Sequence, residues 1–268
     1  MQPRKLALLL LLLPSCGAQT ATDSTTTGAG YRPLIAPQSS VNIGVCVDGS
    51  ASTDQAWVAS GLTNIANAFG ASSPRNSDAS AASRPVPPTH IVVRQISSRS
   101  STSSSDELFN FVIGGFPGLL EEPDAAAFDV FAENDALWRL ARAERDAAVE
   151  VSSRNRADFL KEFSTLKFEN SGSEVAGCVT AVRDSFAADA DVHVFLLTDL
   201  QQRGAPQVRG AYSKVHVVAA HICSSDASIC DQQETDFKDL LVQLAVRNSS
   251  FVTVSQLQAE VEKVLVIQ

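Results

Sequence analysis

The sequence predicts an α/β fold: a Rossmann-like, doubly wound, mostly parallel sheet with helices on both faces. Short apolar segments that end in turn-type residues recur along the 268-residue chain, as in strands buried on both sides. Longer segments between them carry apolar residues at three- and four-residue spacing, which is typical of amphipathic helices. Strands that alternate with helices pair in parallel, and right-handed crossovers then place helices on both faces of the sheet.

These two patterns predict the elements in chain order. An apolar run over 41–47 predicts the first strand, and the spacing of apolar residues over 53–69 predicts the helix after it. The later elements follow in the same way: strands over 91–96, 108–113, 192–198, 215–222 and 251–254, and helices over 135–163, 174–186, 231–246 and 256–266. The strand over 108–113 is expected to pair back as a hairpin, and residues 114–133 to be irregular. With no second core and no internal repeat, residues 41–268 are expected to form one domain.

Residues 1–15 have the pattern of an export signal. A basic start with Arg4 and Lys5 precedes a short apolar run. That run is far below the roughly 20 residues of a membrane-spanning helix and has the length of a signal peptide's apolar region. The next residues, Leu-Pro-Ser-Cys-Gly, resemble a bacterial lipobox, in which cleavage precedes a lipidated cysteine, here Cys16. We therefore expect a lipoprotein of the bacterial cell envelope, anchored on the outer side of the cytoplasmic membrane or in the outer membrane. An ordinary secretory signal peptide is the alternative.

Composition and charge indicate how the domain is attached and which classes of partner it can bind. Residues 16–40 are rich in Thr, Ser, Gly, Ala and Pro and are expected to form a flexible tether between membrane and domain. The formal net charge is −9, and removal of a leader that holds two basic and no acidic residues would make it −11. No block of Lys and Arg offsets this charge, which excludes nucleic acid and anionic lipid headgroups as partners. Cations and basic protein surfaces suit it.

Four cysteines remain beside Cys16. Cys223 and Cys230 flank a polar loop, which in an oxidising compartment predicts a disulfide between them. Closing so short a loop stabilises a fold by roughly 2.5 kcal/mol in the chain-entropy model. Cys46 and Cys178 have apolar neighbours and are expected to be buried free thiols, with a bridge between them as the alternative.

Oxygen-bearing side chains follow the ends of predicted strands, where open α/β sheets form their sites. The first strand ends in Asp48-Gly49-Ser50-Ala51-Ser52, and a later strand ends in Thr198-Asp199-Leu200. Between them along the chain, a polar segment that ends in Ser173-Glu174 precedes a helix.

These three segments resemble the von Willebrand factor type A family over about residues 41–254, and least over 97–168. That family has an Asp-x-Ser-x-Ser loop after its first strand, a Thr before a later helix and an Asp after its fourth strand, which together form a metal-ion-dependent adhesion site. The resemblance assigns five metal ligands: Asp48, Ser50, Ser52, Ser173 and Asp199. Ser173 stands where the family usually has Thr, and Leu200 follows Asp199 where the family often has Gly.

The resemblance implies a binding protein rather than an enzyme. Two carboxylates and three hydroxyls suit Mg²⁺, which prefers about six hard oxygen ligands, and Mn²⁺ or Ca²⁺ are the other candidates. Because hydroxyls carry no charge, the metal would keep affinity for a carboxylate from a protein partner. The alternative is a metal-independent structural or assembly lipoprotein with a degenerate site, in which Asp48 merely caps the first helix.

The sequence lacks the residues that several enzyme classes and zinc sites require. A phosphatase of the haloacid dehalogenase type needs a second Asp at position 50, which is Ser50. No Gly-x-Ser-x-Gly or phosphate-binding Gly-x-x-x-x-Gly-Lys segment is present, and a metal-dependent hydrolase would lack a placed base. The four histidines lack zinc spacing and are expected to be strand residues with local hydrogen bonds: His90, His193, His216 and His221.

Overall fold

The structure is a computed structural model, and the residues it describes all belong to one unit, Arg32–Gln268. They are residues 32–37, 39–49, 53–71, 84–98, 106–122, 131–168, 174–202, 212–222 and 227–266. Several predicted features lie outside these ranges: the leader, most of the tether, Cys16, Ser50, Ser52, Ser173 and Cys223.

A six-stranded sheet confirms the predicted fold class. Its strands are β2 Val41–Asp48, β3 Thr89–Ile96, β4 Glu107–Ile113, β6 Val192–Thr198, β7 Val215–His221 and β8 Asn248–Val252. Their order is β4-β3-β2-β6-β7-β8, and every neighbouring pair is parallel except the hairpin pair β3 and β4. Numbered among themselves these six strands have the order 3-2-1-4-5-6, which defines a doubly wound sheet with its switch point between β2 and β6.

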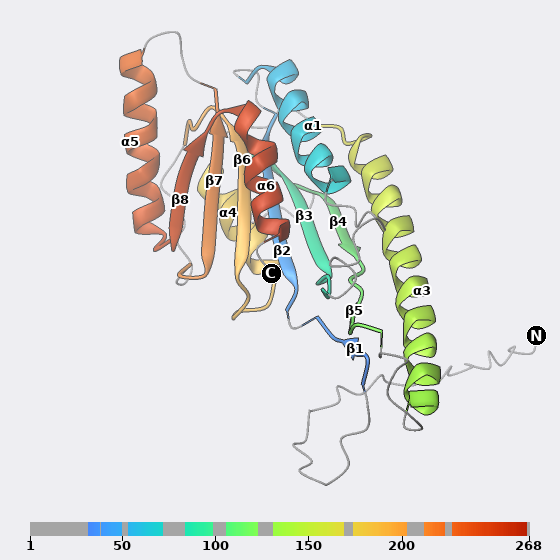
Figure 1. Ribbon diagram of the computed structural model, residues 1–268. Coiled ribbons are helices and arrows are strands. Elements are labelled where there is room, and N and C mark those ends of the chain that lie inside the picture. The colour runs from blue at the N-terminus through green and yellow to red at the C-terminus, as the bar shows by residue number, and fades with distance from the viewer. Residues whose placement is uncertain are drawn as a thin grey trace, which may run out of the picture. The chain divides into compact units, whose positions relative to one another are not determined.

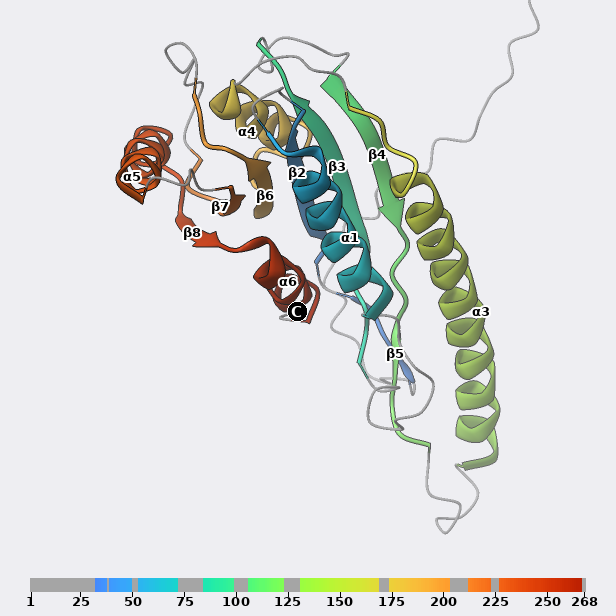
Figure 2. The same ribbon diagram turned by 90° about the horizontal axis from the view of Figure 1, so that it is seen from above.

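Helices cover both faces of this sheet (Figures 1 and 2). They are α1 Gln55–Ala71, α3 Phe131–Phe163, α4 Val175–Asp184, α5 Ala227–Gln243 and α6 Leu257–Val266, with a short 3₁₀ turn, η2 Val254–Gln256, before α6. Buried side chains form two clusters, one on each face. The α4 and α5 side chains pack into one cluster, and those of α1, α6 and the end of α3 into the other.

The sequence of β2 shows why both faces can be covered. Every residue of this strand is buried, and alternate side chains serve opposite faces. Val45 and Val47 pack toward α1 and α6, whereas Cys46 packs toward α4. A strand that is apolar on both faces is typical of a parallel sheet between two helical layers.

The chain departs from the predicted boundaries at its edges. Leu34–Ile35 (β1), in the predicted tether, pairs antiparallel with Gly118–Leu119 (β5), in the predicted irregular segment. The helix α5 begins before the predicted residue 231, so Cys230 lies inside the helix and not at the end of a loop. The strand β8 begins at Asn248 although its first residues are polar and exposed, because they pair with β7 at the sheet edge.

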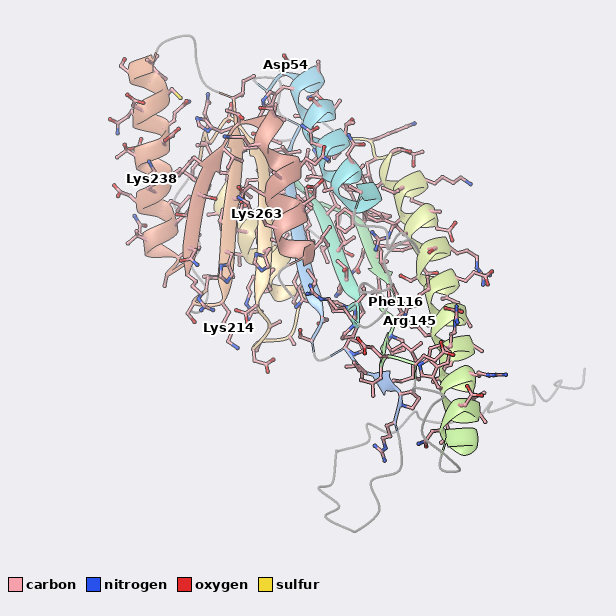
Figure 3. The ribbon with its side chains drawn as sticks, in the orientation of Figure 1. Asp54, Phe116, Arg145, Lys214, Lys238 and Lys263 are labelled. Atoms are coloured by element: carbon pink, nitrogen blue, oxygen red, sulfur yellow. A yellow bond between two sulfur atoms is a disulfide. The ribbon has the colours of Figure 1, made fainter. Side chains whose placement is uncertain are left out.

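The long helix α3 packs partly on β4 and partly beyond it. Near β5, the Trp138 indole donates a hydrogen bond to the carbonyl of Leu120 at 3.0 Å. The Arg145 guanidinium lies 5.6 Å from the ring centre of buried Phe116, and both are labelled in Figure 3. These contacts stabilise a segment whose sequence shows no regular pattern.

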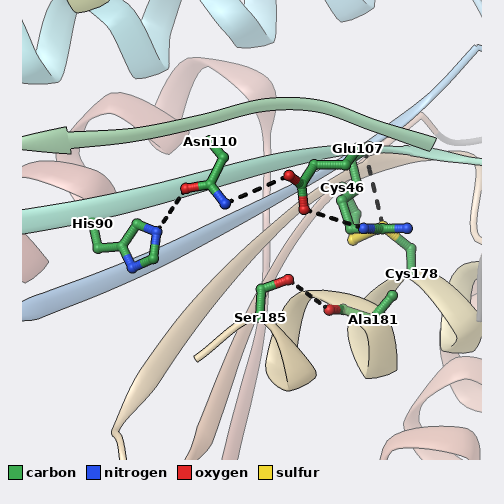
Figure 4. A network of polar contacts seen from close by, with 8 residues as sticks. Cys46, His90, Glu107, Asn110, Cys178, Ala181 and Ser185 are labelled. Atoms are coloured by element: carbon green, nitrogen blue, oxygen red, sulfur yellow. Dashed lines mark hydrogen bonds and ion pairs between the residues drawn. A yellow bond between two sulfur atoms is a disulfide. The ribbon is translucent and has the colours of Figure 1, made fainter. Parts of the chain in front are cut away.

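The prediction of free thiols at Cys46 and Cys178 is wrong, because the two form a disulfide between β2 and α4 (Figure 4). Their Cα atoms are 6.1 Å apart, and both residues are completely buried. Cys46 faces α4 because side chains alternate along β2, and Cys178 lies on the apolar face of α4. The helix packs antiparallel on the strand, with Val182 over Gly44, and this brings the two cysteines within bonding range. The two residues are 132 positions apart, which no local pattern could reveal.

A polar network lies beside this disulfide on β3 and β4 (Figure 4). The buried Arg94 guanidinium pairs with the Glu107 carboxylate at 3.5 Å, and Asn110 donates to the other carboxylate oxygen at 3.5 Å. His90 contacts the Asn110 side-chain oxygen at 2.8 Å, which confirms a local hydrogen bond for this histidine.

Among the described residues, no helix is both long enough and apolar enough to cross a membrane.

Candidate metal site at the switch point of the sheet

Two predicted ligands, Asp48 and Asp199, lie at the point where the strand order reverses. Asp48 is the last residue of β2, and Asp199 directly follows β6. The two strands are neighbours, with Val47 opposite Leu197, and each strand ends one residue later, at Asp48 and Thr198. Doubly wound sheets bind their ligands outside the carboxyl ends of the strands at this reversal. The topology therefore puts both carboxylates where such folds form sites.

Thr198 links the two strand ends. Its hydroxyl donates a hydrogen bond to Oδ2 of Asp48 at 3.1 Å and accepts one from the backbone N–H of Leu200 at 3.1 Å. Both Asp48 and Thr198 are completely buried, so the bond is shielded from water. A shielded bond to a carboxylate is stronger than one in solvent, and it holds the Asp48 side chain toward β6.

Asp199 is held by its own turn. Its Oδ1 accepts the backbone N–H of Gln201 at 3.0 Å, two residues on, as Asp side chains often do at turns. Between them, Leu200 has a φ of 60°, in the left-handed region that favours glycine. This backbone conformation favours Gly, which the von Willebrand factor type A family often has at the position after its Asp. In this chain Leu200 adopts the same conformation.

The start of α4 is fastened to the same edge of the sheet. Glu174 donates its backbone N–H to the carbonyl of Ser97, directly after β3, at 2.9 Å. Ala176 donates its N–H to the side-chain oxygen of Gln202, from the segment after β6, at 3.0 Å. Gln202 thereby satisfies one of the N–H groups that a helix leaves open at its first turn. The residues that follow Ser173 are therefore placed at the carboxyl ends of β3 and β6.

The first helix has another cap. The backbone N–H of Ala56 donates to Oδ1 of Asp54 at 2.8 Å, one residue before α1 begins; Asp54 is labelled in Figure 3. Asp54 is thus the N-cap that the degenerate-site alternative assigned to Asp48. Asp48 is instead held in the sheet.

The structure describes two of the five predicted ligands and places them at the ends of neighbouring strands, where Asp48 closes β2 and Asp199 follows β6. The other three lie outside the described residues. Sequence reasoning gave no role to Thr198 or Gln202. The only local signal for Thr198 is a polar residue that closes an apolar strand just before Asp199. Gln202 gave no signal, because its bond to Ala176 depends on how α4 returns to the sheet.

The donor set fits a hard divalent cation. Buried carboxylates are costly unless hydrogen bonds or a cation compensate them. The carboxylates of Asp48 and Asp199 and the Thr198 hydroxyl that is bonded to Asp48 offer only oxygen atoms, and oxygen is the ligand type that Mg²⁺, Mn²⁺ and Ca²⁺ prefer. Asp48 and Asp199 are therefore the described residues whose chemistry suits such an ion.

The fold and this edge define a class: an α/β domain of doubly wound topology with carboxylates at its switch point. No family model matches the chain, and no curated protein does. Among solved structures, the chain is similar to an aerotolerance-related membrane protein from Bacteroides fragilis NCTC 9343, crystallised with multiple mutations to serine. The identity is 9%, the TM-score is 0.39, and the match covers 85% of this chain and 100% of that chain. At this similarity the function of that protein says nothing about the function of this one.

Proposed function

We propose that this chain is an exported, membrane-anchored binding protein that engages a protein partner through a divalent cation at Asp48, Ser50, Ser52, Ser173 and Asp199. The observation that carries the proposal is the hydrogen bond from Thr198 to Asp48, which joins the ends of β2 and β6 at the reversal of strand order. Asp199 directly follows Thr198, so the two predicted carboxylates belong to the ends of neighbouring strands, which supports the proposal.

In this proposal the protein holds the ion and leaves a position open for the partner. Asp48 and Asp199 supply the charged ligands, and the three serine hydroxyls supply neutral ones. A bound Mg²⁺, with Mn²⁺ or Ca²⁺ as the other candidates, would supply affinity for a carboxylate on the partner surface. The role is binding without turnover, and membrane attachment is through lipid on Cys16.

The disulfides support export. Cys46 is bonded to Cys178, and Cys230 is also disulfide-bonded, so at least three cysteines of the described residues are oxidised. Stable disulfides persist in oxidising compartments such as the periplasm and the cell surface and are rare in the cytosol. This agrees with the signal peptide and lipobox predicted from the sequence, and with attachment at the outer face of a membrane.

The metal is tested by the magnesium-dependent change in melting temperature. For the wild type we expect a higher melting temperature with Mg²⁺ than with a chelator, because an ion that binds only the folded state stabilises it. Asp48→Asn keeps an oxygen that can accept the Thr198 hydrogen bond but removes the charge, so we expect the increment to vanish. Asp184→Asn, at the other end of α4 and exposed, removes the same charge and should keep the increment.

The comparison also separates the two candidate functions. The metal-independent scaffold predicts identical melting temperatures with Mg²⁺, Mn²⁺ and chelator in all three proteins. That result would refute the metal-dependent proposal while leaving export and anchoring intact. An increment that survives in Asp48→Asn would place the ion elsewhere and would also refute it.

A further inference from the structure

Three side chains with metal-binding atoms meet at the carboxyl end of β7, on the face of the sheet that α5 covers. His221 is the last residue of β7, Cys230 lies in the first turn of α5, and Glu234 is one turn further along that helix. Cys230 and Glu234 are four residues apart, so they share the helix face that looks toward His221. This cluster is separate from the predicted oxygen ligands and includes sulfur and nitrogen.

The distances match those between ligands of one small ion. Nε2 of His221 lies 3.3 Å from Sγ of Cys230 and 3.3 Å from Oε1 of Glu234. The three donor atoms all lie within 4.8 Å of one another. In a tetrahedral zinc site with bonds of about 2.0–2.3 Å, ligand atoms are about 3.3–3.8 Å apart. The two distances from Nε2 of His221, both 3.3 Å, already lie in this range.

The covalent state of Cys230 decides whether the site can work. Cys230 is disulfide-bonded, and a disulfide sulfur is a poor ligand, whereas a thiolate is a strong one. A small dithiol can reduce the bond: it gives two electrons and two protons to the disulfide, which becomes two thiols, while the dithiol itself closes to a disulfide. A bound cation would then displace the proton of the Cys230 thiol.

We propose that reduction of the Cys230 disulfide opens a site for a Zn²⁺-type cation, formed by the Cys230 thiolate, the His221 imidazole and the Glu234 carboxylate. In the oxidised protein this site is closed. Nitrogen, sulfur and one carboxylate suit Zn²⁺ and do not suit Mg²⁺. One thiolate and one carboxylate also balance the charge of a divalent ion.

The surroundings favour the required protonation states. Burial, the largest effect, lowers the pKa of His221, opposed by Glu234 and assisted by Lys238, and a lowered pKa favours the neutral imidazole, which is the form that binds metals. The first turn of α5 provides the partial positive charge that stabilises a Cys230 thiolate. Lys238, labelled on α5 in Figure 3, contacts the other oxygen of Glu234 at 3.3 Å and leaves Oε1 toward His221.

The cluster also has a route to solvent. A cavity of about 450 Å³ is lined by His221 and Glu234 together with Phe251, Thr253 and Trp57. It is large enough for a hydrated cation to approach and for a water molecule to serve as the fourth ligand, which sites with three protein ligands require. Cys230 is itself buried, at 7% exposure, and is reached through His221 and Glu234, whereas both sulfurs of the Cys46–Cys178 disulfide belong to completely buried residues.

Cobalt can test the site in the full-length chain, because a thiolate-to-cobalt charge-transfer band reports sulfur ligation and the oxygen ligands cannot produce it. We expect the band in protein treated with a dithiol and then freed of it under anaerobic conditions, and no band in untreated protein. Cys16→Ser with Cys223→Ser frees Cys230 without a reductant, because the Cys46–Cys178 bond takes the remaining cysteines. This double variant should also show the band, with circular dichroism to verify folding.

Single variants identify the ligands. We expect Cys230→Ser to abolish the band in reduced protein, and His221→Gln or Glu234→Gln to weaken cobalt affinity about tenfold or more, since even outer-shell changes cost that much. Asp239→Asn, exposed on the same helix, removes a charge and should leave affinity unchanged. A folded double variant without the band, or a band that persists in Cys230→Ser, would overturn the proposal. The result is independent of whether the magnesium site exists.

Discussion

Leu200 is the residue where backbone conformation and side-chain packing oppose each other. Its φ of 60° places it in the left-handed region, which costs an L-residue roughly 1–2 kcal/mol. Its side chain is only 4% exposed and packs in the cluster on the α4 and α5 face. Since truncation of a buried leucine costs roughly 2–5 kcal/mol, packing outweighs strain and explains why Leu can stand at a glycine-type position.

This balance predicts an inverted ranking of two variants. At ordinary backbone angles Gly is about 0.5–1 kcal/mol less stable than Ala. At position 200 both Leu200→Ala and Leu200→Gly should destabilise the protein, but the Gly variant should be the more stable of the two by up to about 1 kcal/mol, because it alone relieves the strain. Urea unfolding of the two variants measures the difference. If Ala is the more stable, the left-handed conformation is not costly here.

His193 and His216 form a stacked pair on neighbouring strands, with ring centres 4.7 Å apart. Burial, the largest effect, and the nearby His216 lower the pKa of His193 from 6.5 to about 4, although Asp191 opposes the shift. Between about pH 6.5 and pH 4 the unfolded chain therefore binds a proton at this residue that the folded protein does not. Its contribution to stability is present above pH 6.5 and is lost as the pH falls through about 4.

His193→Gln should reduce the loss of stability in acid. We expect the free energy of unfolding to fall less between about pH 7 and pH 4 in this variant than in the wild type, because Gln takes up no proton. Denaturant titrations at several pH values measure this difference, with His90→Gln as a control for the loss of a strand histidine outside the stacked pair. Parallel curves for wild type and His193→Gln would contradict the assigned cause.

The strand β2, which ends at Asp48, and the helix α4 pack unusually close to each other. A Cβ at Gly44 of β2 would lie 2.0 Å from Cγ1 of Val182 on α4, so only glycine lets the helix approach this closely. Two residues on, Cys46 is bonded to Cys178 of the same helix. In the chain-entropy model a bond closing so long a loop stabilises the fold by about 5 kcal/mol. Packing and the covalent bond therefore fix the start of α4 relative to Asp48.

Gly44→Ala should push α4 away from β2. The Val182 side chain is short and branched and cannot swing aside, so we expect a loss of about 1–3 kcal/mol or more in the free energy of unfolding. Gly70→Ala is the matched control: a Cβ there meets nothing within 4 Å, near the end of α1, and Ala favours helix by up to about 1 kcal/mol. Chemical denaturation compares them. Equal stability of the two variants would show that α4 has room to move.

At the scale of the whole molecule, covalent bonds and sheet topology together define the protein. The parallel sheet between two helical layers buries a cluster on each face, as expected for a domain large enough to need no metal for folding. The disulfides add stability suited to an oxidising compartment. On the proposals above, one bond supports the oxygen-ligand edge and the other controls a separate sulfur-containing site.

Local patterns determined the order and type of the elements. Apolar runs located β2, β3, β6 and β7, because strands buried on both faces leave a signal in each short segment. The same runs placed Asp48 and Asp199 at strand ends before any contact was known. The polar start of β8 and the pairing of β1 with β5 escaped prediction, because they depend on a neighbouring strand and not on their own side chains.

Only the tertiary structure decided which distant residues meet. The Cys46–Cys178 bond joins positions 132 apart, and the hydrogen bond from Thr198 to Asp48 joins positions 150 apart. The cluster around His221 likewise needs α5 to begin early enough to bring Cys230 into the helix. Periodicity reports the environment of each segment, whereas such contacts depend on how segments return to one another across the sheet. The sequence by itself therefore determined the fold class and two candidate ligands. The packing of α4 decided the disulfide to Cys46, and the packing of α5 decided the cluster around His221.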